Sequence, residues 1–380
     1  MTSYDYIIVG AGAAGLMLAD ALGKDPFFND KSILLLEKDA KKSNDRTWCF
    51  WEKGDGDFES ILHKKWSQIR FAGNQMNKNY TIAPYFYKMV RGLDFYISYL
   101  ERISKYPNIT FLQEEVLNIT EVENEILVTT TSKSYKGAII FNSIYNYKEP
   151  LQQKRYPVLQ QHFIGWFIKT DIPVFDEGVP TFMDFSIPQQ GNTRFMYVLP
   201  TSKTEALVEY TLFSEKLLEK EAYEEAIRTY LSKNLNVLKY TILEKERGRI
   251  PMTCYDFSKK NTDSMLYIGT AGGWSKPSTG YTFKNTSKKV TTLVDHLKRE
   301  KPLTSFRKKN KFWFYDLLLL DILFKNNELG HSIFESLFKN RKPQLIFKFL
   351  DEETNLWEDV QFISSLSPLP FIKALIRRLL

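Results

Sequence analysis

The sequence contains little cysteine and no long apolar run. Cys49 and Cys254 are the only thiols among 380 residues, too few for a disulfide framework. The longest apolar stretch, 312–324, is too short to cross a bilayer and is interrupted by Asp316 and Asp321. No secretory leader precedes the first apolar strand, so we expect a reducing, cytoplasmic compartment.

Patterns typical of metal, nucleophile and nucleic-acid sites are also missing. None of the four histidines forms a ligand pair, so we expect no metal. No Ser/His/Asp or Cys/His arrangement is recognisable. The net charge of +7, from 52 Lys and Arg against 45 Asp and Glu, is not clustered in one motif, so we expect no nucleic-acid partner. A mildly basic surface does suit an anionic membrane.

A βαβ unit opens the chain. Residues 4–9 (YDYIIV) have the pattern of a buried strand, 13–24 that of a helix, and 32–37 (SILLLE) that of a second buried strand. Parallel strands joined in this way need a right-handed crossover. The length of the chain and its 43% apolar content further predict two closely packed domains.

The turn of this unit carries a dinucleotide fingerprint, GAGAAG. Gly10 permits the tight turn, Gly12 lets backbone amides approach a pyrophosphate, and Gly15 lets helix and strand pack closely. Glu37 ends the second strand, where its carboxylate can accept ribose hydroxyls. Three neighbouring residues complete the expected contacts: Ala13, Ala14 and Lys38. The fingerprint does not choose between FAD and NAD, and a glycine-rich turn without a ligand is the alternative.

A second glycine segment lies at 265–283 (MLYIGTAGGWSKPSTGYTF). Gly269 and Gly272 follow a strand, Gly280 precedes a helix, and Pro277 stiffens the loop between them. An extended flavin needs a second contact region far along the chain, so this segment favours FAD. A purely structural loop is the alternative.

Between the two glycine segments the strand pattern changes. Residues 160–212 alternate apolar and polar at hairpin spacing, which indicates an antiparallel sheet. We therefore predict a discontinuous, doubly wound α/β domain for FAD (1–150 and 245–300) with an inserted antiparallel-sheet substrate domain (151–244). Residues 301–380 read as helices. The last of them, 370–380, either lies at a membrane surface or docks on the protein as an ordinary amphipathic helix.

Several motifs together resemble one family, the bacterial lycopene cyclases of the flavoprotein type. They follow in order along residues 1 to about 290: GAGAAG with Glu37, NDRTWCFW (44–51), FMDF (182–185), RFMYVLP with ALVEYT (206–211), GRIPMT (248–253) and GTAGGWSKPSTGYTF (269–283). NDRTWCFW and the last segment are much more specific than the glycine fingerprint.

The resemblance implies a fold similar to the glutathione-reductase-like flavoproteins, close to the aromatic hydroxylases. It implies a lycopene β-cyclase, an intramolecular lyase or isomerase that turns each end of lycopene into a β-ionone ring, through γ-carotene to β-carotene. FAD would act in its reduced form without net electron transfer, and NADPH would serve only as an indirect source of electrons. The substrate, lycopene or another acyclic carotenoid end, implies an enzyme peripheral on the inner face of the cell membrane.

Two positions depart from what this resemblance leads us to expect. Thr270 stands where flavoproteins of this fold often carry an acidic residue, so a ribityl contact would need a hydroxyl or an amide. Plant relatives have a double-glutamate FLEE motif, whereas this chain has Glu209 followed by Tyr210. Only the first carboxylate can be carried over.

Ring closure needs a strong acid to protonate an alkene, and a dry pocket for the carbocation. Glu209 matches the glutamate of the family, and burial in its strand would raise its pKa. A solvent-facing strand glutamate is the alternative. Asp184 is the second candidate, positioning the acid or accepting the ring proton, unless it only bonds local amides. Arg46 is expected to contact flavin or phosphate. Trp48 either lines the flavin or the substrate tunnel or, like Trp51, packs in the core.

Two other functions are compatible with these residues. One is a flavin monooxygenase or isoprenoid reductase of similar fold, which would consume NADPH in each turnover; a second glycine fingerprint for NADPH is not recognisable. The other is a carotenoid or lipid carrier that keeps a flavin fold without catalysis.

Overall fold

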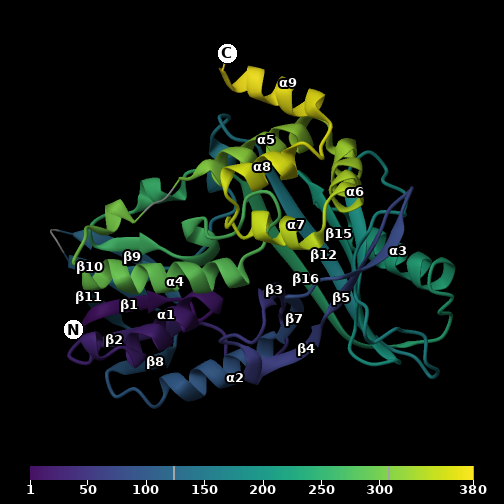
Figure 1. Ribbon diagram of the computed structural model, residues 1–380. Helices are drawn as coiled ribbons and strands as arrows, with labels where there is room; N and C mark the ends of the chain where they lie inside the picture. The colour runs from purple at the N-terminus through teal and green to yellow at the C-terminus, as the bar shows by residue number, and fades with distance from the viewer. Residues whose placement is uncertain (123–124, 307–308, 380) are drawn as a thin grey trace.

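The computed structural model describes residues 1–122, 125–306 and 309–379. Three parts are evident in Figure 1: a sheet-and-helix layer that contains the N-terminus, a long sheet beside it, and C-terminal helices at the top of the view, packed against the long sheet. The predicted α/β fold with an antiparallel second sheet and a helical C-terminus is confirmed.

The first sheet is a doubly wound, mostly parallel sheet. Its strand order is β8-β2-β1-β11-β10-β9, with β17 beside β11, and only β10 and β9 are antiparallel to their neighbours. The strands are β1 Ser3–Val9, β2 Ile33–Glu37, β8 Ile109–Gln113, β9 Val116–Val122, β10 Glu125–Thr130, β11 Ser134–Asn142 and β17 Met265–Tyr267. Strands β10 and β11 form a hairpin, and β11 is also a central parallel strand beside β1.

Both faces of this sheet are buried, which explains its continuous apolar strands. Tyr6 and Ile8 of β1 pack under three helices, whereas Ile7 and Val9 pack with apolar residues of β10 on the other face. The helices are α1 Ala13–Lys24, α2 Gly92–Ile103 and α4 Phe283–Lys298. In Figure 1, α4 lies directly against α1. The first and second glycine segments are thereby brought together.

The second sheet has seven strands in the order β16-β12-β15-β14-β13-β5-β6. They are β5 Gln68–Ala72, β6 Asn77–Thr81, β12 Val158–Lys169, β13 Thr181–Asp184, β14 Thr193–Pro200, β15 Glu205–Ser214 and β16 Thr241–Thr253. Helix α3 (Lys220–Lys233) covers one face, and the C-terminal helices cover part of the other. The sheet does not coincide with 151–244. β5 and β6 come from the first 150 residues and extend the sheet beyond the short strand β13, and β16 extends past 244.

A small sheet that the sequence pattern did not reveal connects the two large ones. It consists of β3 Thr47–Lys53, β7 Tyr85–Arg91 and β4 Leu62–Trp66, in this order. Successive residues of β3 enter different cores: Phe50 packs with the first domain and Trp51 with the second. The motif DRTWCFW thus links the two domains.

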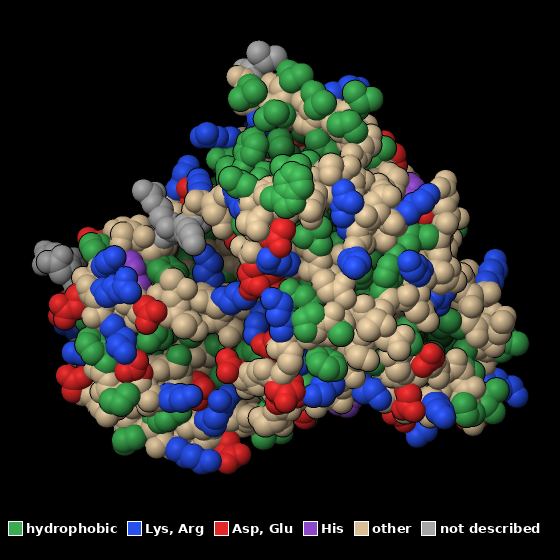
Figure 2. Space-filling model, in the orientation of Figure 1, with side chains coloured by type: hydrophobic (Ala, Val, Ile, Leu, Met, Phe, Trp, Pro, Cys, Tyr) green, Lys and Arg blue, Asp and Glu red, His purple; other side chains and the backbone are tan. Residues whose placement is uncertain are grey.

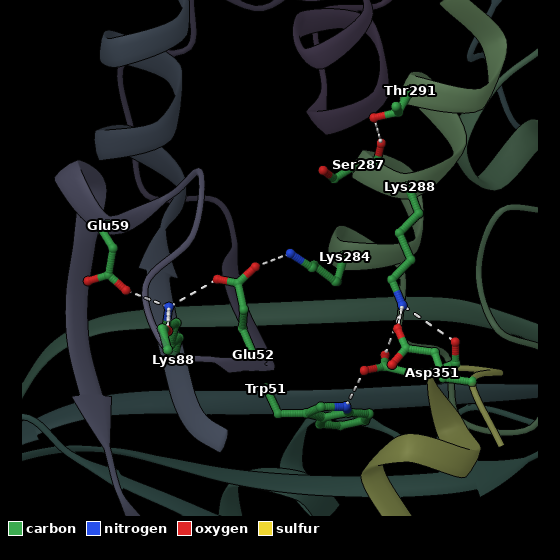
Figure 3. Close-up of polar contacts among 11 residues, drawn as sticks. Trp51, Glu52, Glu59, Lys88, Lys284, Ser287, Lys288, Thr291 and Asp351 are labelled. Atoms are coloured by element: carbon green, nitrogen blue, oxygen red, sulfur yellow. Dashed lines mark hydrogen bonds and ion pairs between the residues drawn. The ribbon is translucent and has the colours of Figure 1, made fainter. Parts of the chain in front are cut away.

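Buried charges reinforce this link (Figure 3). The ammonium of Lys88 on β7 lies between the carboxylates of Glu52 and Glu59, and Glu52 also accepts from Lys284 of α4. A single chain of ion pairs therefore connects the small sheet to the helix that follows the second glycine segment.

Five helices form the C-terminal region: α5 Lys311–Lys325, α6 Gly330–Asn340, α7 Pro343–Leu350, α8 Leu356–Ile363 and α9 Pro368–Leu379. Pro343 and Pro368 each begin a helix, at the position where a missing amide costs no hydrogen bond. Pro370 lies in the first turn of α9, where an amide has no intrahelical partner, so it does not break the helix. Short 3-10 helices occur at η1 Pro26–Phe28, η2 Glu59–Ile61, η3 Glu149–Gln152, η4 Phe257–Lys260, η5 Gly269–Gly272, η6 Leu303–Ser305 and η7 Asn327–Leu329. Over the described ranges, every helix is too short or too polar to cross a membrane.

Candidate active site

A cavity of about 370 Å³ lies between the first glycine turn and the inner face of the second sheet. Its walls come from the start of α1, β3, the strands β12 to β16, and the loop that precedes α4. The site is therefore built from both domains. The residues that line the cavity include Gly12, Ala13, Ala14, Arg46, Gln161, Phe163, Phe195, Tyr197, Glu209, Phe213, Glu246, Gly269, Thr270, Thr279, Gly280 and Thr286.

The three glycines of the first turn have the geometry expected of a dinucleotide site. Gly10 has a φ of +94°, in the left-handed region that favours glycine. A Cβ on Gly15 would lie 1.9 Å from the carbonyl oxygen of Gly10, whereas a Cβ on Gly12 would meet nothing within 4 Å. Gly12 is also the N-cap of α1 and gives it no side-chain cap. The free amides of Ala13 and Ala14 lie at this helix start, on the cavity wall.

Glu37 lies beside this turn, at the end of β2. Its Oε2 accepts from the amide of Ala11 at 2.6 Å, and its Oε1 accepts from the amide of Asp39 at 3.0 Å. The neighbouring Lys38 is exposed and pairs with Glu115 at 3.5 Å, so it does not line the cavity. Arg46 does line the cavity, near the mouth of an adjoining groove of about 620 Å³.

The second glycine segment reaches the same cavity at its two ends. Gly269 (φ +60°) approaches α1 so closely that a Cβ there would lie 2.9 Å from that of Ala14. Gly280 (φ +71°) lies against Gln161 of β12. The middle of the segment has a structural role instead: a Cβ on Gly272 would lie 2.1 Å from the carbonyl oxygen of Tyr267, and Pro277 lines a separate small cavity. The expected flavin contacts of Gly272 and Pro277 are thus not supported.

Three polar atoms on the cavity wall are buried without a hydrogen-bond partner. They are Oε1 of Gln161, Oγ1 of Thr279 and Oγ1 of Thr286. Buried polar atoms are normally satisfied, so these point to a polar ligand. A flavin with its ribityl chain presents donors and acceptors of this kind, and the residues present therefore fit FAD.

Glu209 lies on β15 with its carboxylate in the cavity and only 8% of its surface exposed. Apolar and aromatic side chains surround it on the same wall, among them Phe163 and Phe213. Its Oε1 accepts from the hydroxyl of Thr211 at 2.6 Å. Burial raises the pKa of Glu209 well above the usual value, and the nearby Glu246 raises it further. The alternative of a solvent-facing strand glutamate is therefore wrong.

Glu246 on β16 is a second buried carboxylate of this cavity, and sequence reasoning missed it. Its Oε2 accepts from the hydroxyl of Thr47 at 2.7 Å. Burial raises its pKa too, opposed by the Thr47 hydrogen bond and by Arg91 and Arg46. The sequence signal was its position just before GRIPMT, in alternation with exposed Lys245 and Arg247.

A glycine separates the two glutamates. Gly165 of β12 is the register partner of Glu209 on one side and of Glu246 on the other. A Cβ on Gly165 would lie 3.4 Å from Cβ of Glu209 and 3.2 Å from Cγ of Glu246. Both side chains therefore project to the same face, and the residue between them has no side chain.

Asp184, the second sequence candidate, does not share this site. Its carboxylate accepts from the hydroxyl of Tyr230 on α3 at 2.7 Å and from the amide of Ser186 at 2.9 Å. The irregular pairing of β13 turns it toward the helix-covered face, and its neighbour Met183 lines the cavity instead. The expected role of Asp184 beside the acid is not supported.

The two tryptophans of β3 pack, as expected. Trp48 stacks on Phe283 at a centroid distance of 5.0 Å, at the edge of the cavity. Trp51 stacks on Phe347 and donates from Nε1 to Asp351 at 2.9 Å, which fastens β3 to the C-terminal helices (Figure 3). Across the described ranges no group of His, Cys, Asp and Glu could hold a metal ion.

Solved structures share this fold at low sequence identity. A geranylgeranyl bacteriochlorophyll reductase-like protein from Thermoplasma acidophilum has a TM-score of 0.60 at 12% identity, covering 100% of this chain and 97% of that one. A flavin-dependent brominase gives 0.61 at 12%, covering 99% of each chain. A halogenase variant in complex with FAD gives 0.59 at 12%, covering 98% and 85%. They support an FAD-binding α/β fold.

No curated protein sequence matches this chain significantly. A family model described as lycopene cyclase protein, in contrast, matches residues 5–376, nearly the whole chain. With both glycine segments and a buried glutamate meeting in one cavity, the chain belongs to the lycopene cyclase family.

Proposed function

We propose that the chain is a lycopene β-cyclase that closes the ends of lycopene to β-ionone rings, through γ-carotene to β-carotene, with reduced FAD bound. One observation carries this proposal. Glu209 is a buried carboxyl with a raised pKa on an aromatic wall, in the cavity that also contains the dinucleotide turn. A carboxyl that keeps its proton at neutral pH can protonate an alkene in a dry site.

FAD would be held by residues of both domains. The amides of Ala13 and Ala14 suit the pyrophosphate, and the segment ends at Gly269 and Gly280 suit the flavin. Glu37, beside the glycine turn, suits the ribose. Thr270, Gln161, Thr279 and Thr286 offer polar contacts along the cavity. Reduced FAD supplies electron density beside a developing cation, and NADPH enters only as a source of its electrons.

The chain itself performs the proton chemistry. Glu209 transfers its proton to the terminal double bond of the substrate, and the next double bond attacks the resulting tertiary cation. Phe163, Phe195 and Phe213 exclude water, and their ring faces stabilise positive charge. Loss of a ring proton then gives the β-ring, with no net oxidation or reduction.

Lycopene dissolves in membranes, and we place the enzyme peripherally on the inner face of the cell membrane. The apolar side chains exposed along α8 and α9 support this location. They gather at the top of the molecule in Figure 2, next to Lys and Arg.

Expression in cells that accumulate lycopene tests the function. The wild-type chain should convert lycopene to γ- and β-carotene, and Glu209→Gln should lower this conversion by about 100-fold or more. Glu205→Gln is the matched control, because Glu205 lies on the same strand and pairs with Lys169 at 3.0 Å outside the cavity. Unchanged lycopene with folded, flavin-loaded wild-type protein would reject the proposal.

The same cultures separate a carrier from an enzyme, since a carrier would retain pigment without cyclising it. The fold relatives include reductases and halogenases, so a monooxygenase or isoprenoid reductase remains the other candidate. Counting NADPH oxidised per ring formed distinguishes it: a cyclase consumes none per turnover, and a monooxygenase or reductase at least one.

A further inference from the structure

We propose that Glu246 is the base that removes the ring proton, and that it returns this proton to Glu209 past Gly165, the residue aligned with both. This inference rests on the proposed cyclisation and adds a residue that the sequence motifs did not indicate. Its basis is geometric: two buried carboxylates on β15 and β16, the two strands that flank β12, face one cavity.

The register fixes this arrangement. Because Glu209 and Glu246 are both aligned with Gly165, their side chains lie on the same face of the sheet. Each glutamate is on a strand next to β12, with Glu209 on one side of it and Glu246 on the other. Any larger residue at 165 would place its side chain between them. The added Cβ would come within 2.8 Å of Cδ1 of Leu207 and 3.2 Å of Cγ of Glu246. Gly165 therefore leaves the position between the two glutamates without a side chain of its own, and the side chain of Leu207 reaches toward it.

The surroundings assign different protonation states to the two groups. Glu246 accepts from Thr47 and faces two cations, Arg91 of β7 and Arg46 before β3, with Glu244 of its own strand as an opposing charge. Glu209 accepts from the hydroxyl of Thr211, and Phe163, Leu207 and Phe213 line the same wall. Two buried like charges resist simultaneous ionisation, so the two carboxylates share one proton. This proton resides mainly on Glu209, because the cations beside Glu246 stabilise the ionised form of Glu246. Glu209 is then the acid and Glu246 the base.

The step balances without any further reagent. The O–H bond of Glu209 breaks as a C–H bond forms at the terminal alkene carbon, and the neighbouring double bond closes the ring. A ring C–H bond then breaks toward Glu246, and its electron pair becomes the ring double bond. Transfer of that proton from Glu246 to Glu209 restores the pair, so no proton is gained or lost per ring.

The test compares Glu246→Gln with Glu209→Gln and the control Glu205→Gln. Gln has the size of Glu but cannot accept the proton. The Glu246→Gln variant should therefore bind flavin and show the melting transition of a folded protein. Its rate of β-ring formation should fall by about 100-fold or more. Glu246→Asp should recover part of the rate. If Glu246 had only a structural role, the Asp variant would not be expected to be faster than the Gln variant.

Gly165→Ala provides a second measurement with both carboxylates retained. Its methyl group lies between them, so the first ring per enzyme should still form in a rapid-mixing experiment, while repeated turnover falls at least tenfold. A structural defect would lower both phases equally. Flavin content and melting temperature identify misfolded protein.

The outcomes are separable. If wild type cyclises lycopene and Glu209→Gln does not, but Glu246→Gln matches wild type, the role of Glu246 is overturned and the proposed function stands. Equal loss of first and later rings in Gly165→Ala would overturn the proton return. If wild type forms no cyclic product, the proposed function fails and this inference with it.

Discussion

Strand parity decides which carboxylate can act. Glu209 points into the cavity, whereas the next residue, Tyr210, packs on the opposite face with α3 and accepts from Arg194 at 2.8 Å. A second acid at position 210, as in a double-glutamate motif, would therefore lie behind the sheet in this chain. The second cavity carboxylate comes instead from Glu246, two strands away.

The raised pKa of Glu209 predicts an effect on stability. The unfolded carboxyl titrates near 4.5, while burial holds the folded one protonated to a higher pH. The folded state thus binds more protons over this interval, and stability falls as pH rises from about 5 toward 9. Glu209→Gln removes the ionisation, so it should be near neutral at pH 5 and stabilise the fold by about 1–3 kcal/mol at pH 9.

Urea unfolding at both pH values measures this difference. Glu205→Gln again serves as the control and should show no pH-dependent gain. A stabilisation by Glu209→Gln that is equal at pH 5 and pH 9 would show that Glu209 does not change its proton affinity on folding.

At the scale of elements, a buried ion pair fixes the second glycine segment. Lys276 of this loop donates to Asp316 of α5 at 2.9 Å, and Ser278 donates to the other oxygen of Asp316 at 2.6 Å. Both charged side chains are almost fully buried. The loop that lines the cavity is thus held by a C-terminal helix, which the sequence showed only as an interruption of an apolar run.

Asp316→Asn should destabilise the protein by about 3 kcal/mol, because it removes the closer carboxylate from the buried Lys276 ammonium, which keeps its longer pair with Glu352 at 3.3 Å. Thermal and urea unfolding measure the loss, and flavin should dissociate at lower denaturant than global unfolding requires. Glu101→Gln, which removes an exposed pair with Lys105, should change neither property. A loss no larger than that of Glu101→Gln would show that the pair does not hold the loop.

How much the sequence could predict differs between elements. Continuous apolar strands joined by a glycine turn predict the βαβ unit, because few other structures bury both faces of a strand. Strands such as β4 (LHKKW) and β6 (NKNYT) contain few apolar residues. Their sequence pattern therefore predicted neither the third sheet nor the additional strands of the second sheet. Pairing register is a long-range property, and for this reason Glu209 was found by motif while Glu246 and Gly165 were not.

At the scale of the molecule, exposed apolar side chains concentrate in the C-terminal region (Figure 2). On α9 they are Leu369, Ile372, Ile376 and Leu379, spaced as one helical stripe that faces outward. The opposite side of α9 docks on the protein through Ala374 and through Arg378, which pairs with Asp321. The exposed residues of α8 continue the apolar surface: Leu356, Trp357, Val360 and Ile363.

This stripe predicts binding to anionic bilayers. Lys373 and Arg377 flank it, and no acidic residue follows Asp359. Each fully buried aliphatic side chain contributes about 1.5–3 kcal/mol, so replacing Leu369, Ile372 and Ile376 together by Ser should weaken vesicle binding by at least about 100-fold. Sedimentation with vesicles that contain anionic lipid measures it, and vesicles of zwitterionic lipid alone should bind the wild type less.

The control for this triple variant carries Ser at three exposed apolar positions elsewhere, Ile172, Leu238 and Leu243. It removes a similar apolar area, so a general effect of surface hydrophobicity would weaken its binding equally. If α9 forms the membrane-binding face, the control variant should bind vesicles as well as the wild type does. The stripe variant should also keep its activity toward lycopene in detergent while losing it toward lycopene in vesicles, because only delivery from the bilayer depends on α9. Equal loss in both assays would place the defect in the active site and contradict a role in membrane docking.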